Sequence, residues 1–257
     1  MNMSGVIDIN RKTLESVESF ITDEDYHASS DNYGLPPQVR NLIDLSIDRE
    51  ITYVDLMLYL QTYFETKEIN YVEVGVSVLK TFYQVSNFLN HSNLYAFDIN
   101  KINPTIESKF TKVKSSDQIN QYEHNTNKIT HFRGDVYNDD DFDKFKNHIN
   151  SKVNVIFSDA CHSKAGLESE YEYFIKDVLA DEFILYYDDL DHSEMREVFF
   201  DVASELELKN PNVNAALLRA NGWLGQHEFA HLNGIITTLD IESILSDNNI
   251  YIPIEYR

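Results

Sequence analysis

The feature that most constrains the fold of this chain is an alternation of short β-branched and aromatic runs with helix-length segments, which starts near residue 71. Strands joined by helix-length crossovers lie parallel in one sheet, with helices on both of its faces. The last two runs are closer together, which predicts an antiparallel strand near the C-terminus. The sequence therefore predicts an α/β fold with a mostly parallel, seven-stranded sheet. The expected strands are 71–74, 94–97, 129–132, 153–157, 182–187, 216–219 and 235–239.

Two segments precede this alternation. Residues 1–32 contain acidic and polar runs, and we expect them to form a polar N-terminal extension outside the core. Apolar residues then recur at helical spacing over 39–50, and a second helix is expected over 53–66. A chain of this length commonly closes around a single α/β core, so residues 33–257 are predicted to form one domain.

The charge of the chain restricts its partners. The sequence has 21 Lys and Arg against 43 Asp and Glu, which gives a formal net charge of −22. Such a charge repels phosphate backbones and anionic lipid headgroups, so neither nucleic acid nor a membrane is expected as a partner. One cysteine, Cys161, cannot form an intramolecular disulfide, and no apolar stretch suits a signal peptide or a membrane span. We therefore expect a cytoplasmic protein.

Polar residues follow the first three expected strands. The first strand runs into Glu73-Val74-Gly75 and then Ser77, and the second strand ends at Asp98. Gly134-Asp135 follows the third strand. Ligands of parallel sheets bind beyond the carboxyl ends of the strands, and an acid at the second strand end can accept hydrogen bonds from ribose hydroxyls. These residues predict a cofactor that contains adenosine.

Acidic residues gather where the fourth and fifth expected strands end. Asp159 and His162 follow the fourth strand, and Asp188 and Asp189 follow the fifth. If these strands are neighbours, three carboxylates share one pocket, which favours a divalent cation: Mg²⁺ first, with Mn²⁺ or Ca²⁺ as alternatives. An imidazole titrates near neutrality, so His162 could take the proton of a hydroxyl group held there.

Taken together, these strand ends resemble a known family. Glu73-Val74-Gly75, Asp98 and Gly134-Asp135 resemble the cofactor site of class I S-adenosylmethionine-dependent methyltransferases, which have a Rossmann-like fold. The Asp-x-x-His turn and the following acidic pair resemble the macrocin-type metal-dependent sugar O-methyltransferases. The resemblance implies that residues 33–257 form a catalytic domain that methylates a hydroxyl of a sugar or a similar small polyol.

The resemblance also implies residue roles. His162 would be the general base, and the metal ligands would be Asp159, Asp188 and Asp189. The residues implied in binding S-adenosylmethionine are Glu73, Gly75, Ser77, Asp98, Asp135 and Asp159.

Two other functions stay open at this point. The later glycines usual in the family's cofactor loop are replaced by Ser77, Val78, Leu79 and Lys80, which is compatible with a non-catalytic binding or regulatory protein on a decayed scaffold. Residues 227–231 read His-Glu-Phe-Ala-His, which matches the zinc-protease helix signature. Nearby glycines and a following β-branched run argue against a helix there. The aromatic-rich helices before residue 71 could form a homodimer interface, or they could equally cover the cofactor.

Overall fold

The computed structural model describes residues 1–18, 51–77, 79–102, 104–220, 231–250, 252 and 254–256. The strands are β1 (Asn70–Val74), β2 (Asn93–Asp98), β3 (Thr111–Ser115), β4 (Ile119–His124), β5 (Asn127–Arg133), β6 (Val153–Ser158), β7 (Leu179–Tyr187), β8 (Asn214–Ala220), β9 (His231–Thr237) and β10 (Ile254–Tyr256). The helices are α1 (Met3–Glu18), α4 (Tyr53–Gln61), α5 (Lys80–Phe88), α6 (Pro104–Glu107), α7 (Asp139–Lys146), α8 (Lys164–Glu170), the π-helix η1 (Tyr171–Ile175), α9 (Lys176–Val178), α10 (Ser193–Lys209) and α11 (Ile241–Asp247).

The strands form one sheet in the order β10-β8-β9-β7-β6-β1-β2-β5-β4-β3. Its centre, from β7 through β6, β1 and β2 to β5, is parallel, and β9 and β8 join it antiparallel beyond β7. The predicted α/β fold, with its antiparallel C-terminal strands, is confirmed. The described sheet has ten strands and not seven, because the hairpin β3–β4 and the short strand β10 were not predicted. Every residue of β3 is exposed, so that strand has no apolar pattern by which to recognise it.

The order of the strands reverses at β1, which creates a topological switch point in the sheet. From β1 the chain proceeds to β2 and β5 on one side, and it then returns to place β6 on the other side of β1. Ligands of open α/β sheets bind at such a point, beyond the carboxyl ends of the strands. The candidate site is therefore expected beyond β1 and β6.

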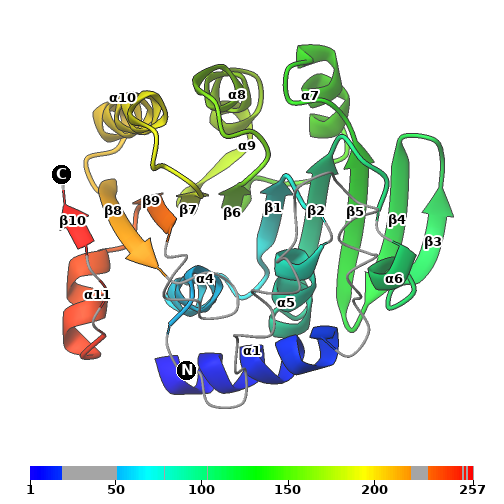
Figure 1. Ribbon diagram of the computed structural model, residues 1–257, viewed down its shortest axis with the longest axis horizontal. Helices are drawn as coiled ribbons and strands as arrows, with labels where there is room; N and C mark the ends of the chain where they lie inside the picture. Colours follow the sequence, from blue (N-terminus) through cyan, green and yellow to red (C-terminus); the bar gives the residue numbers. More distant parts are fainter. Residues whose placement is uncertain are drawn as a thin grey trace, which may run out of the picture.

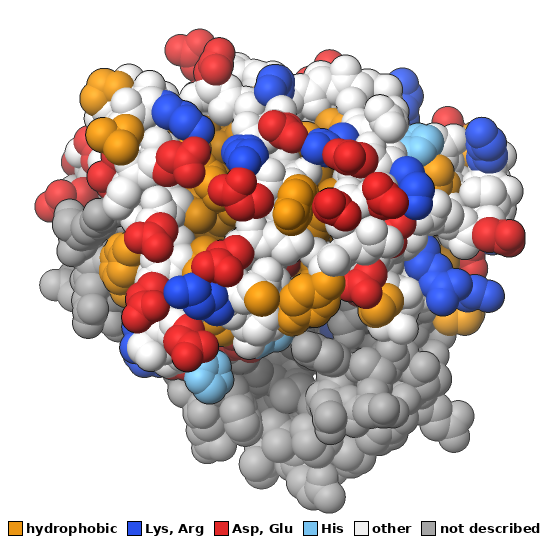
Figure 2. Space-filling model, turned by 90° about the horizontal axis from the view of Figure 1, so that it is seen from above, with side chains coloured by type: hydrophobic (Ala, Val, Ile, Leu, Met, Phe, Trp, Pro, Cys, Tyr) orange, Lys and Arg blue, Asp and Glu red, His pale blue; other side chains and the backbone are white. Residues whose placement is uncertain are grey.

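Helices cover both faces of the sheet (Figure 1). Helices α7, α8 and α10 pack on one face, and α1, α4, α5 and α11 lie on the other. On the face of α7, α8 and α10, acidic side chains are spread widely, with Lys and Arg between them (Figure 2). No helix in the described part of the chain is both long and apolar enough to span a membrane.

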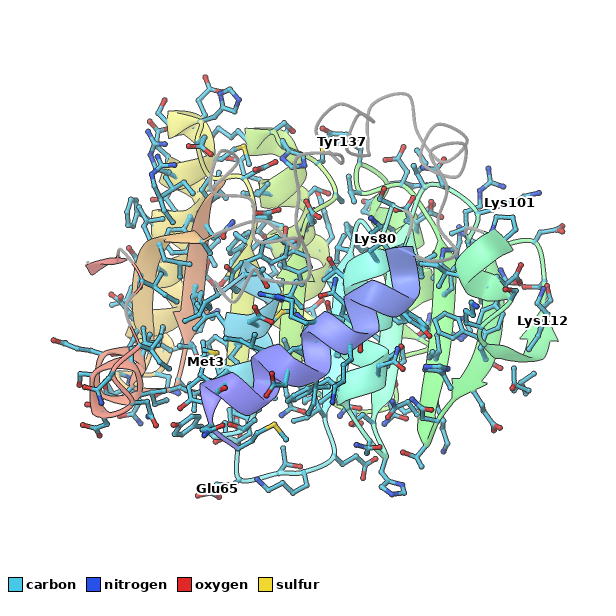
Figure 3. The ribbon with its side chains drawn as sticks, turned by 60° about the horizontal axis from the view of Figure 1, so that its bottom comes forward. Met3, Glu65, Lys80, Lys101, Lys112 and Tyr137 are labelled. Carbon is cyan, nitrogen blue, oxygen red and sulfur yellow. The ribbon has the colours of Figure 1, made fainter. Side chains whose placement is uncertain are left out.

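The N-terminal segment contributes to the core, which differs from the expected polar extension. Helix α1 lies across the face that carries α4 and α5 (Figure 3), and it buries Met3, Val6 and Ile7. Arg11 Nη2 lies 2.9 Å from Asp55 Oδ2 of α4 in a buried ion pair. Polar residues interrupt the apolar ones along α1, so its sequence shows no obvious apolar stripe beyond a short helical pattern that starts near Leu14. The helix expected over 39–50 lies outside the described residues.

Candidate active site at the carboxyl ends of the strands

Gly75 allows the ends of β1 and β6 to meet. Its φ is +87°, and a Cβ atom there would lie 2.3 Å from Cα of Ala160 and 2.4 Å from the carbonyl oxygen of Asp159. No other residue fits so close to a second backbone. The amide of Asp159 donates to the carbonyl of Val74 at 2.8 Å, which joins the two strand ends. Gly75 therefore positions the turn that carries Asp159.

The loop after Gly75 is held by the acid at the end of β2. Asp98 Oδ2 accepts hydrogen bonds from the amides of Val76 and Ser77 at 2.9 and 3.0 Å. Ser77 and Leu79 have φ values of 43° and 63°, in the left-handed region that favours glycine. The loop thus adopts backbone conformations typical of glycine at residues that are not glycine. Asp98 and Ser77 lie together, as the predicted cofactor site requires.

Asp135 lies in the turn after β5, next to Gly134, whose amide donates to the carbonyl of Asp98 at 2.9 Å. Its Oδ1 accepts a hydrogen bond from the amide of Tyr137 at 3.0 Å, and its own amide donates to Asp141 Oδ2 at 3.1 Å. These bonds give the turn a fixed shape. The predicted contact of Asp135 with the adenine stays a prediction.

Glu73 is a buried acid next to the last residue of β1. Its side chain accepts a hydrogen bond from the hydroxyl of Tyr71 at 2.6 Å. Burial raises the pKa of Glu73 from 4.5 to about 8, and the charge of Asp98 adds to this rise. Glu73 therefore carries at most part of a negative charge at neutral pH.

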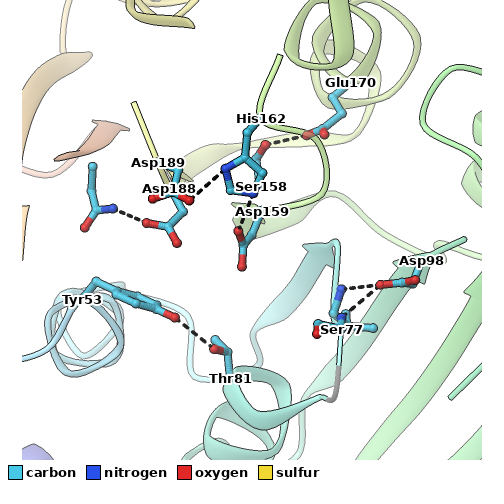
Figure 4. A network of polar contacts seen from close by, with 12 residues as sticks. Tyr53, Ser77, Thr81, Asp98, Ser158, Asp159, His162, Glu170, Asp188 and Asp189 are labelled. Carbon is cyan, nitrogen blue, oxygen red and sulfur yellow. Dashed lines mark hydrogen bonds and ion pairs between the residues drawn. The ribbon is translucent and has the colours of Figure 1, made fainter. Parts of the chain in front are cut away.

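His162 lies between two carboxylates (Figure 4). Its Nδ1 is 2.9 Å from Asp189 Oδ2, and its Nε2 is 3.6 Å from Asp159 Oδ1. Burial and the neighbouring charges of Asp188 and Asp189 raise the pKa of Asp159 well above its ordinary value. The structure thus brings together all four residues that the sequence placed at the ends of the fourth and fifth strands.

The side chains of Asp188 and Asp189 are positioned in different ways, one by a hydrogen bond and the other by its backbone conformation. Asn233 Nδ2 donates a short hydrogen bond to Asp188 Oδ1, and the hydroxyl of Tyr186 donates to Asn233 Oδ1 at 2.9 Å. Asn233 is fully buried. Asp189 has a φ of 54°, and this left-handed backbone turns its carboxylate towards His162. Sequence analysis missed Asn233, because its strand gives no sign of which acid lies beside it.

The three predicted metal ligands do not form a ready-made metal-binding group in this arrangement. Among the residues that the structure describes, no three His, Cys, Asp or Glu side chains form a group that could hold a metal ion. The reason is visible in the contacts: Asp188 binds Asn233 and Asp189 binds His162. We therefore derive no chemical step from a metal.

Sequence analysis also missed Glu170, at the junction of α8 with the π-helix η1. Its Oε2 accepts a hydrogen bond from the hydroxyl of Ser158 at 2.6 Å, at the end of β6. Burial raises the pKa of Glu170 to about 8. This contact joins the start of the π-helix to the end of β6, just before the turn that carries Asp159 and His162, and no sequence motif marks it.

The predicted alternative based on zinc concerns residues 227–231. The first four of these residues lie outside the described part of the chain. His231 begins strand β9 and pairs with Ala220 of β8. The zinc-protease signature needs both of its histidines on one helix, and the second histidine here belongs to a strand. This position of His231 argues against the protease.

No protein-family model matches the chain, and no curated protein matches it by sequence. The structure resembles an O-methyltransferase from Bacillus cereus in complex with SAH, with a TM-score of 0.52 and 13% identity over 88% of this chain and 90% of that chain. A plantazolicin methyltransferase in complex with SAH gives a TM-score of 0.47 and 13% identity over 91% and 98% of the two chains. The Bacillus cereus likeness establishes a shared fold.

Proposed function

We propose that this chain is an S-adenosylmethionine-dependent O-methyltransferase that acts on a small hydroxylated molecule. The observation that carries the proposal is the position of His162, clamped by Asp189 beside the switch point of a sheet with a methyltransferase fold. A histidine oriented by a carboxylate is suited to remove a proton from a hydroxyl group. The alternative of a non-catalytic protein on the same scaffold offers no role for this pair.

The cofactor would lie across the ends of β2, β1 and β6. In this proposal Asp98 accepts hydrogen bonds from the ribose, and the loop from Gly75 to Ser77 passes beneath the rest of the molecule. Carboxyl oxygens of Glu73 and Asp159 would accept hydrogen bonds from the ammonium group of its methionine portion. Asp135, in the turn after β5, would face the adenine. When bound, S-adenosylmethionine supplies a methyl group on a positively charged sulfur.

His162 would act as the general base. The contact of Nδ1 with Asp189 favours the tautomer that carries its proton on Nδ1, so Nε2 carries the lone pair. Nε2 would take the proton of the acceptor hydroxyl, whose oxygen would then receive the methyl group that the cofactor supplies, with S-adenosylhomocysteine as the leaving group. Asp189 stabilises the imidazolium ion that results. The products are a methyl ether and S-adenosylhomocysteine.

The acceptor that we propose is a sugar or a similar polyol. The strongly negative chain repels nucleic acid, and several carboxylates at the site can accept hydrogen bonds from hydroxyl groups. The Mg²⁺ dependence expected from Asp159, Asp188 and Asp189 stays a prediction. It would require Asp189 to exchange its contact with His162 for the ion.

The first test is calorimetry with S-adenosylmethionine and S-adenosylhomocysteine, followed by transfer of labelled methyl groups to a panel of sugars and polyols. We expect His162→Ala to keep its affinity for both nucleosides and to lose about 10²- to 10⁴-fold in turnover, because it removes the base. His192→Ala changes an exposed histidine a few residues beyond Asp189 and serves as the matched control.

Three outcomes would contradict parts of the proposal. A wild-type protein that binds neither nucleoside would favour the non-catalytic alternative. Near-normal turnover of His162→Ala would exclude His162 as the base. Full activity after treatment with EDTA would contradict the metal prediction, whereas loss of activity that Mg²⁺ restores would support it.

A further inference from the structure

Tyr53 begins helix α4 and faces the ends of β1 and β6, although it precedes both strands in the sequence. Its ring stacks on Phe157 of β6 with the ring centroids 5.6 Å apart. Its hydroxyl lies 3.4 Å from Oγ1 of Thr81, in the first turn of α5. Both residues are buried. Figure 4 shows this pair of hydroxyl groups across from Asp159 and Asp188.

The phenol of Tyr53 stays protonated at neutral pH. Burial raises its pKa well above the ordinary value, and the negative charges of Asp188 and Asp159 raise it further. Tyr53 and Thr81 therefore present uncharged hydroxyl groups on one side of the site, while carboxylates occupy the other side. A ligand that spans the two sides would meet both environments.

The amino acid end of S-adenosylmethionine has this dual character, since it carries an ammonium group and a carboxylate. The proposed ribose contact with Asp98 places the nucleoside over β2, so the amino acid end lies beyond β1 near Glu73 and Asp159. Their carboxyl oxygens accept hydrogen bonds from the ammonium group, and any negative charge that they carry repels the carboxylate. The carboxylate needs neutral hydrogen-bond donors, and the dipole at the start of α5 also favours an anion.

We infer that the hydroxyl groups of Tyr53 and Thr81 bind the carboxylate at the amino acid end of the cofactor. The inference rests on the proposed function and goes beyond it, because it assigns a contact to a helix that lies before the first strand of the sheet. Hydrogen bonds to a charged group are stronger than those between neutral groups, so the loss of one hydroxyl is measurable in binding.

The test compares S-adenosylhomocysteine with 5′-methylthioadenosine, which keeps the nucleoside and the thioether but lacks the amino acid. We expect Tyr53→Phe to weaken the binding of S-adenosylhomocysteine by about 10- to 100-fold and to change that of 5′-methylthioadenosine by less than about twofold. Thr81→Val should show the same selectivity with a smaller loss. Tyr95→Phe is the matched control, because it removes a hydroxyl from a buried tyrosine of β2 that contacts Asn150.

The result has a clear reading in each case. Wild-type affinity of Tyr53→Phe for S-adenosylhomocysteine would overturn the inference. An equal loss for both ligands would also overturn it, since the effect would then not depend on the amino acid end. If Tyr53→Phe does not fold, Thr81→Val decides, because valine has nearly the shape of threonine. A wild-type protein that binds neither ligand would overturn the proposed function, and this inference with it.

Discussion

Three residues of this site have a left-handed backbone although none of them is glycine. Ser77, Leu79 and Asp189 all have positive φ values, between 43° and 63°. Such a conformation costs about 1–2 kcal/mol for a residue with a Cβ atom. Strain of this kind persists where the surrounding structure imposes it, and it is frequent at functional sites. At Asp189 the strained backbone has a clear consequence, because it places the carboxylate within 2.9 Å of His162 Nδ1.

Two substitutions at Asp189 separate strain from chemistry. Asp189→Gly and Asp189→Ala both remove the carboxylate, so each should lower turnover about 10²-fold or more. Glycine has no Cβ atom and adopts a positive φ without strain, whereas alanine does not. Asp189→Gly should therefore be more stable than Asp189→Ala by about 1 kcal/mol. Chemical denaturation measures this difference in unfolding free energy. Equal stabilities would mean that the backbone at Asp189 is not strained.

Among the elements, the central strands could be recognised from their apolar residues, while the polar hairpin β3–β4 could not.

Strand β5 also contains a feature that its apolar pattern does not explain. His131 is 1% exposed, and neither of its ring nitrogens has a hydrogen-bond partner. Burial lowers the pKa of His131 from 6.5 to about 4. The ring is therefore neutral in the folded protein at neutral pH, and its buried nitrogens destabilise β5.

Replacing His131 by leucine should stabilise the protein. At pH 7 we expect a gain of about 1 kcal/mol, because two unsatisfied polar atoms leave the core. In the wild type the unfolded chain binds a proton at His131 between pH 6.5 and about 4, while the folded chain does not. Stability is therefore lost as pH falls through this window, and His131→Leu should remove that loss. Denaturation at pH 7 and pH 5 tests this, and a gain that does not grow at pH 5 would contradict it.

For the whole molecule, helix α1 connects the N-terminus to the helix that carries Tyr53. Asp55 of α4 is fully buried, and it accepts hydrogen bonds from Arg11 and from Asn10, whose Nδ2 lies 2.6 Å from Oδ1. The amide of Thr52 also donates to Asp55 at 2.9 Å, which fixes the start of α4. The position of Tyr53 therefore depends on a helix about forty residues earlier in the chain.

Breaking this ion pair should destabilise the whole chain. Arg11→Met leaves the buried carboxylate of Asp55 without its charge partner, which should lower the unfolding free energy by about 3–5 kcal/mol. Lys12→Met changes the neighbouring exposed residue and should alter it by less than about 0.5 kcal/mol. Thermal or chemical denaturation of the two variants gives the comparison. Similar stabilities would show that α1 contributes little to the fold.

The sequence by itself determined the order of the strands along the chain, their parallel centre and the polar residues at their ends. These properties follow from local patterns, because a strand and the turn after it are encoded by adjacent residues. The sequence alone could therefore predict that five polar residues lie at strand ends: Asp98, Asp159, His162, Asp188 and Asp189. Ser77 and Asp98 lie together as expected from the order of the first two strands.

Only the tertiary structure decided how these residues meet. The close approach of Gly75 to Ala160, the bond from Asn233 to Asp188 and the position of Tyr53 join segments that are far apart in the sequence. Burial then sets the charge of Glu73, which composition cannot reveal. The three acids do not form the expected metal group, since Asp189 contacts His162 instead. Long-range packing and desolvation decide such pairings, and neither is written in a local sequence pattern.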